Sequence, residues 1–205
     1  MVDHPSGKPL YVITPSMNVR PTLSAPIPAD GPELIATLFR HSAEFNNFQT
    51  AFRLLAGSVS NARDNLRAFL FAFTALDSFL SKFFKQHKTQ LLQLTKADLS
   101  IKIHDYVERI RELMESGQIG KSYPLGCRFA LVASYLGFKN LDNTIAEFDH
   151  AKQCRDDIAH GNDFDEAALP TVQVRNWLGE LVRLYMARLD TGQLSFSELP
   201  KTPPI

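Results

Sequence analysis

The chain has 205 residues, of which 44% are hydrophobic, and this is enough apolar material for one packed domain. Its 22 basic and 22 acidic residues balance, so the net charge is zero. Proteins that bind nucleic acid mainly through its phosphates are usually basic overall, so any nucleic-acid site in this chain must be a local patch. No apolar run reaches the length of a membrane helix, no signal-peptide pattern opens the chain, and the two cysteines lie far apart, so we expect a cytoplasmic protein with reduced thiols and no membrane contact.

Residues 1–31 differ from the rest because prolines recur throughout them, and proline is excluded from helix interiors and central strands. We expect an irregular, extended arm, although a proline-rich ligand for a partner domain is the alternative. From Pro32 the apolar residues recur at helical spacing, so residues 32–190 are predicted to form a helical bundle. Residues 191–205 contain prolines again and are predicted to form an irregular tail.

The fold class predicted from this spacing is all-α, an up-and-down bundle of about five to six helices. The second helix is apolar almost all round between Leu66 and Phe84, which indicates a place at the centre of a bundle or in a dimer interface. Gly57 and Ser58 are expected to separate the first helix from the second. In chain order, the predicted helices cover 32–56, 60–92, 100–115, 129–138, 144–162 and 171–189.

One carboxylate, Asp77, interrupts the apolar surface of the second helix. A buried carboxylate is costly unless it is paired, so we expect an arginine or a backbone donor to meet it, and Arg155 is the preferred candidate. An aspartate on the wet side of the helix is the equally weighted alternative.

The helix predicted over 144–162 has marked ends. Thr144 and Glu147 have the spacing of a capping box, and Gly161 suits the left-handed residue that closes a helix. Its last turns carry Arg155 and His160, which lie five residues apart and therefore diverge by about 140° and by about 7.5 Å along the axis. One helix cannot bring both groups to one substrate atom, whereas two copies that face each other could.

The segment Arg155-Asp156-Asp157-Ile158-Ala159-His160, followed by Gly161, resembles the R-x(4–6)-H motif of the HEPN superfamily. The long helix around Asp77 also resembles the early core helix of that superfamily. The resemblance implies a helical bundle, often dimeric, that cuts RNA without a metal or cofactor and leaves 2′,3′-cyclic phosphate and 5′-hydroxyl ends.

By that resemblance, His160 would transfer the proton, Arg155 would stabilise the charge on the phosphorane, Asp156 would orient Arg155, and Asp77 would support it. The settings it implies are toxin–antitoxin and phage-defence systems, in which an antitoxin or another protein would regulate a homodimer. The alternative is a non-catalytic HEPN-like dimer that binds a partner protein or nucleic acid. Net neutrality and the acidic segment after Gly161 agree with that alternative.

Two other chemistries are considered and set aside. Glu147 with His150, and Asp157 with His160, have ligand spacing, but both pairs lie on one helix, whereas di-iron bundles need pairs on two helices. We therefore expect no metal site. Cys154 is adjacent to Arg155 and could be a nucleophile, but a half-buried structural cysteine is favoured. On the last helix, Arg175, Arg183 and Arg188 are expected on the solvated side, with a basic patch as the alternative.

Overall fold

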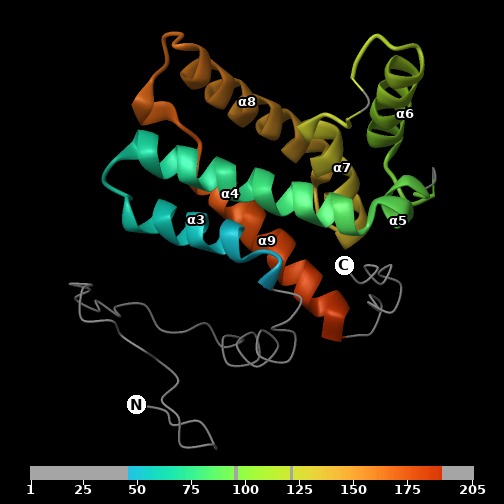
Figure 1. The fold of residues 1–205 in the computed structure, drawn as a ribbon, viewed down its shortest axis with the longest axis horizontal. Helices are drawn as coiled ribbons and strands as arrows, with labels where there is room; N and C mark the ends of the chain where they lie inside the picture. Colours follow the sequence, from blue (N-terminus) through green and yellow to red (C-terminus); the bar gives the residue numbers. More distant parts are fainter. Residues whose placement is uncertain (1–45, 95–96, 121, 191–205) are drawn as a thin grey trace, which may run out of the picture. The chain divides into compact units, whose positions relative to one another are not determined.

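The computed structural model describes residues 46–94, 97–120 and 122–190, and within these residues the chain forms helices and loops without any strand (Figure 1). The predicted all-α helical bundle is therefore confirmed. In chain order the elements are α3 (Gln49–Ser60), α4 (Asn65–Gln86), α5 (Lys88–Leu92), α6 (Ile101–Glu115), α7 (Leu125–Leu136), α8 (Leu141–His160), the short 3-10 helix η1 (Glu166–Ala168) and α9 (Thr171–Asp190).

Several sequence predictions fall outside the described residues. The proline-rich arm over 1–31, most of the helix predicted over 32–56 and the tail over 191–205 are in this group. The boundaries proposed for these segments stay predictions.

The helix α4 forms the centre of the bundle, as its apolar sequence predicts. Figure 1 shows α4 between α3 and α8, and α4 also packs against α7 and α9. Its phenylalanines other than Phe71 are almost completely buried, and each buried side chain of this size stabilises the fold by roughly 1.5–3 kcal/mol. The buried aromatic side chains of the core are Phe48, Phe69, Phe73, Phe79, Phe83, Phe84, Phe129, Phe148, Trp177 and Tyr185.

The predicted break at Gly57 and Ser58 is wrong, because α3 continues through both residues to Ser60. Gly57 is needed for close packing: a Cβ there would lie 3.2 Å from Cδ2 of Phe71 on α4. Ser58 is completely buried, and its hydroxyl donates to the carbonyl of Ala68 at 2.6 Å. It also accepts a hydrogen bond from Nε of Arg175 at 2.8 Å, while the Ser58 carbonyl accepts from Nη2 of Arg175 at 2.6 Å. The break falls instead at residues 61–64.

The helix predicted over 60–92 is divided into α4 and α5 at His87. Asp64 begins α4 as its N-cap, because its carboxylate accepts from the backbone N–H of Arg67 at 2.8 Å. His87 is buried against the ring of Phe83 at 4.5 Å between centroids, and burial lowers its pKa. This histidine belongs to the core and does not serve as a surface cation.

The later helices agree more closely with the sequence. The helix α6 begins after Ser100, whose hydroxyl accepts from the N–H of Ile103, as predicted. The helix α7 covers Leu125–Leu136 and begins directly after Pro124, and Gly137 closes it with a φ of 81°. Val172, in the first turn of α9, is 62% exposed.

Candidate functional site

The helix α8 carries the Arg–His motif, and its start differs from the prediction. It begins at Leu141, after Asn140 in the left-handed conformation with a φ of 55°. The predicted capping box at Thr144 and Glu147 is wrong, because Thr144 already lies inside the helix. Its hydroxyl donates to the carbonyl of Asn140 at 3.1 Å instead of capping a free N–H.

The end of α8 matches the prediction. Gly161 has a φ of 70°, a conformation that glycine adopts without steric cost. The N–H of Asn162 donates to the carbonyl of Asp157 at 2.9 Å, and the Asn162 side chain donates to the Asp157 carboxylate at 3.0 Å. The chain therefore leaves the helix immediately after His160.

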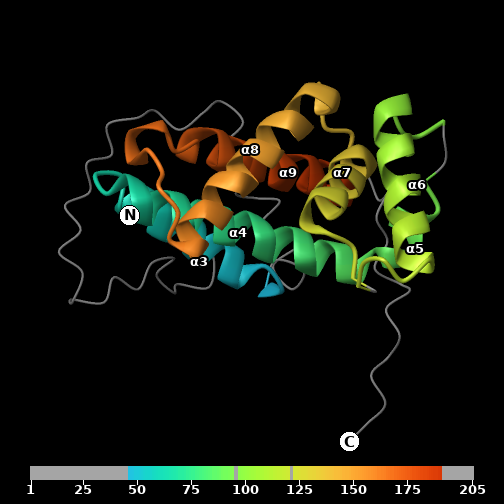
Figure 2. The same cartoon turned by 90° about the horizontal axis from the view of Figure 1, so that it is seen from above.

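The position of α8 is fixed by its apolar side. Phe148 is fully buried, stacks on Phe129 of α7 at 4.3 Å between centroids and lies 6.1 Å from Phe73 of α4. Ala151 is also fully buried. Figure 2 shows α8 crossing α4 obliquely, so that its later turns extend beyond the α7 contact. Arg155, one turn after Ala151, is thereby placed over α4.

Arg155 is held on two sides. Its guanidinium carbon lies 5.3 Å from the centroid of the Phe73 ring, a cation–π distance. Its Nε is buried and lies 3.0 Å from Oδ1 of Asp156, an ion-pair contact whose angle is not that of a hydrogen bond. Within the described residues, its two terminal nitrogens form no hydrogen bond, and the side chain is 35% exposed. The site therefore presents an open pair of N–H donors.

Asp156 connects Arg155 to a lysine that the sequence analysis did not identify. Its Oδ2 accepts a hydrogen bond from Nζ of Lys152 at 2.6 Å. Burial opposes ionisation of Asp156, but the Lys152 hydrogen bond and the charges of Arg155, Lys152 and His160 outweigh it and lower its pKa. Asp156 is therefore an ionised carboxylate with each oxygen next to one cation. The lysine could have been found from its i, i+4 spacing to Asp156.

His160 is exposed at the last residue of α8. It makes no hydrogen bond or ion pair with other residues in the described part of the chain, although it is close enough to Asp156 to help stabilise that carboxylate. Arg155 and His160 do not meet within one chain, as their helical spacing predicts.

Asp77 does not pair with Arg155, so the preferred candidate for its partner is wrong. Its Oδ1 accepts from the hydroxyl of Ser81 at 3.0 Å and lies 3.8 Å from Nη1 of Arg128 on α7. Nη1 of Arg128 also donates to the Ser81 hydroxyl. The reason is the register of α4: Asp77 lies one turn beyond Phe73, opposite α7 and not opposite the end of α8. An arginine does lie near Asp77, but the Asp77 side chain is 41% exposed, which agrees with the alternative of an aspartate on the solvated side. Asp77 does not support Arg155.

The cysteines do not provide a nucleophile. Both are free thiols, and burial raises the pKa of Cys154 and raises that of Cys127 to about 12. Cys154 also lies next to the negative Asp157, which raises its pKa further. Its Sγ is 3.8 Å from Nε2 of His150.

Among the described residues, no group of three or more His, Cys, Asp or Glu side chains is arranged to hold a metal ion.

The arginines of α9 are bound within the fold and do not form a basic patch. Arg175 bonds to the buried Ser58, so its predicted place on the solvated side is wrong. Arg183 forms two hydrogen bonds with Glu180, at 2.7 and 2.6 Å. Arg188 lies over the ring of Tyr135 at 4.9 Å.

The described cavities lie away from Arg155. A polar cavity of about 550 Å³ lies beside Ser100, Asn140 and Asp142, at the opposite end of the 20-residue helix α8. A smaller cavity of about 370 Å³ lies between α8 and α9, lined by His150 and Trp177 among others. Arg155 is not among the residues that line these two cavities, and its side chain is 35% exposed.

Comparison with protein-family models, with curated proteins and with solved structures finds no match. Within the described residues, no helix has both the length and the apolar character needed to cross a membrane.

Proposed function

We propose that this protein is a metal-independent endoribonuclease of the HEPN type that acts as a homodimer. The observation that carries this proposal is the state of Arg155. Its side chain is held by Asp156 and Phe73, while its two terminal nitrogens form no hydrogen bond with the described residues. Such an edge suits two phosphate oxygens, because a guanidinium forms paired hydrogen bonds with them. The exposed His160 follows on the same helix.

In the proposed reaction, His160 accepts the proton of an RNA 2′-hydroxyl, and the O2′–P bond forms as the P–O5′ bond breaks. The departing 5′ oxygen takes its proton from His160 of the partner subunit. Arg155 stabilises the negative charge that accumulates on the phosphorane oxygens. The nucleophile belongs to the substrate, and the products are a 2′,3′-cyclic phosphate and a 5′-hydroxyl.

The dimer is required by the divergence of Arg155 and His160 on one helix. We place the dimer interface at the end of the bundle where α3 and α8 finish and α9 begins (Figure 1). Three apolar side chains are exposed in these segments: Val59 is 58% exposed, Phe164 is 40% exposed and Val172 is 62% exposed.

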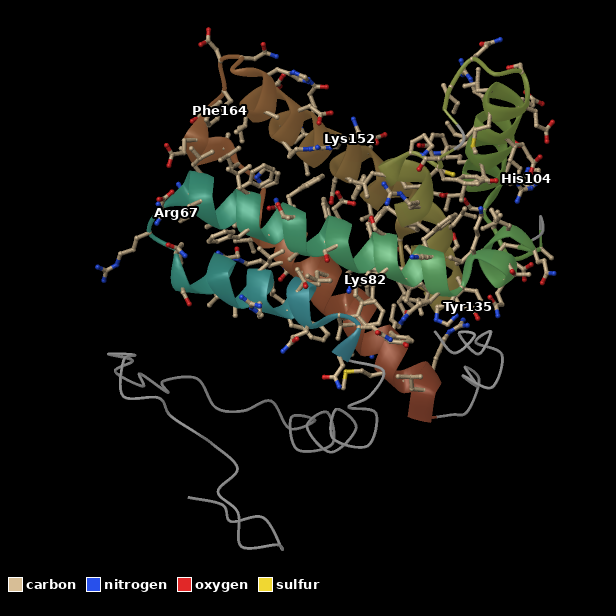
Figure 3. All side chains as sticks on the ribbon, viewed as in Figure 1. Arg67, Lys82, His104, Tyr135, Lys152 and Phe164 are labelled. Carbon is tan, nitrogen blue, oxygen red and sulfur yellow. The ribbon has the colours of Figure 1, made fainter. Side chains whose placement is uncertain are left out.

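The charges beside these side chains are complementary between two copies. Arg63 lies in the turn from α3 to α4, and Arg67, in the first turn of α4, lies 3.7 Å from Asp64. The connection from α8 to α9 carries Asp163 and Asp165. Figure 3 labels Arg67 and Phe164 on the same side of the bundle. A two-fold arrangement can therefore place the basic turn of one copy opposite the acidic connection of the other.

The proposed setting is the cytoplasm, in a toxin–antitoxin or phage-defence system with an antitoxin or similar regulator. This setting is proposed from the Arg–His motif alone. A regulator is included because a nuclease that cuts cellular RNA must be kept inactive until it is needed.

A second candidate function is a non-catalytic dimer that binds a partner protein or nucleic acid. It is favoured by the acidic connection that follows His160, where Asp163, Asp165 and Glu166 would repel an RNA backbone. The two candidates differ in whether purified protein alone cuts RNA.

The test is incubation of RNA with purified protein in EDTA, with the products analysed for 2′,3′-cyclic phosphate ends. Arg155→Ala and His160→Ala should each lower the rate by about 100-fold or more, because each removes charge stabilisation or proton transfer. The matched controls are Arg183→Ala, an arginine engaged with Glu180, and His150→Ala, a second exposed histidine on α8. Both controls should retain the wild-type rate. Intact RNA with the wild-type dimer would favour the non-catalytic candidate.

A further inference from the structure

Lys152 lies one turn before Asp156 on α8 and is labelled in Figure 3. Its Nζ donates to Oδ2 of Asp156 at 2.6 Å, and both side chains are partly shielded, with 37% and 26% of their surfaces exposed. The other carboxylate oxygen, Oδ1, is the one 3.0 Å from Nε of Arg155. One carboxylate therefore joins the lysine to the arginine.

Asp156 has an alternative partner. His160 lies one turn after Asp156, at the same i, i+4 spacing as Lys152 on the other side, so the carboxylate can turn toward either residue. A carboxylate turned toward His160 would leave Arg155 without its ion-pair partner. In the structure, Lys152 bonds to Oδ2, and Oδ1 lies beside Arg155.

We propose that Lys152 is a positioning residue: through Asp156, and with the Phe73 ring beneath the guanidinium, it fixes the direction in which Arg155 presents its terminal nitrogens. This inference rests on the proposed function for its consequence in catalysis, but the positioning itself is a property of the folded chain. Lys152 does not touch the substrate. It determines whether the Arg155 side chain stays in one orientation or exchanges among several.

The same helix provides a matched control. Gln153 donates to the Asp157 carboxylate at 2.9 Å, which is another i, i+4 pair one residue along. Removing Gln153 costs α8 a comparable local bond but leaves the link from Lys152 to Arg155 intact. An effect that belongs only to helix stability would therefore be the same in Lys152→Met and Gln153→Ala.

The first measurement is the order parameter of the Arg155 Nε–Hε bond by NMR, on the full chain. We expect a rigid Arg155 in the wild type, in Gln153→Ala and in Lys152→Arg, because arginine can also donate to Asp156. In Lys152→Met the order parameter should fall to that of a mobile side chain, below about 0.6. The carboxyl resonance of Asp156 should titrate at a higher pH in Lys152→Met, since its pKa is lowered by the Lys152 hydrogen bond.

The second measurement is RNA cleavage in EDTA. Lys152→Met should lower kcat by about 10- to 100-fold, the size expected when a catalytic group is misplaced by about 1 Å. Lys152→Arg should restore most of the rate, and Gln153→Ala should leave it unchanged. Thermal unfolding followed by circular dichroism establishes that each variant is folded.

The two measurements test the positioning role and the proposed function separately. An Arg155 that is as ordered in Lys152→Met as in the wild type, or an equal loss in Gln153→Ala, would overturn the positioning role. A wild-type protein that does not cleave RNA would overturn the proposed function, and the order of Arg155 would still decide the role of Lys152.

Discussion

Individual buried polar residues hold the helices in register. Ser58 is the clearest case, because one side chain on α3 bonds to the backbone of α4 and to Arg175 of α9. Its burial is complete, so water cannot replace these partners. Hydrogen bonds to a charged group contribute more than neutral ones, and a buried donor that loses its acceptor retains its full desolvation cost.

Ser58→Ala should therefore lower the free energy of unfolding by about 1–3 kcal/mol, since Nε of Arg175 loses its acceptor. Ser60→Ala is the control: its hydroxyl is exposed and bonds only to the carbonyl of Ala56, one turn back in the same helix. That change should stay within about 0.5 kcal/mol of the wild type. Chemical denaturation midpoints measure both. Equal effects of the two substitutions would contradict the role given to Ser58.

At the scale of the helix, the position of His160 depends on how α8 ends. The left-handed Gly161 turns the chain immediately after His160, and the Asn162 N–H satisfies the Asp157 carbonyl left free by that turn. A continued helix would carry residues 162–170 along the axis, and His160 would no longer lie at the last residue of α8. The stop after His160 therefore places this side chain at the end of the helix.

Two glycine-to-alanine substitutions, for which we expect opposite changes in the free energy of unfolding, test the role of this turn. Gly161→Ala should destabilise the protein by about 1 kcal/mol, because a side chain at a φ of 70° is strained even though space is open around it. Gly179→Ala, in the middle of α9 with nothing within 4 Å, should instead stabilise it by about 0.5–1 kcal/mol. Thermal unfolding of both variants gives the comparison. Stabilisation by Gly161→Ala would show that α8 does not depend on this turn.

At the scale of the whole molecule, the proposed activity requires two copies. A single chain has one Arg155 and one His160 that diverge, and the described residues around them form an open surface. The exposed apolar residues Val59, Phe164 and Val172 lie in segments at the end of the bundle where α8 finishes. If that end is the interface, a charge placed there should separate the copies.

Val172→Glu should weaken the dimer by about 10-fold or more in dissociation constant, because it would bury an unpaired carboxylate in the proposed interface. Ile101→Glu is the matched control: it also lies in the first turn of a helix and is 81% exposed, but on α6. A glutamate is favourable in a first helical turn, so neither change should unfold the chain. Sedimentation equilibrium measures the association. A wild-type monomer at all concentrations would remove the composite site.

The sequence by itself determined the helical class, the central place of α4, the ends of α7 and α8 at Gly137 and Gly161, and the divergence of Arg155 from His160. These follow from periodicity and local conformational preference, which act within a few residues. Only the tertiary structure decided that Asp77 meets Arg128, that Ser58 binds Arg175 and that Phe73 lies beneath Arg155. Such partners are chosen by the packing of distant helices, because register and crossing angle depend on the whole core and not on local spacing.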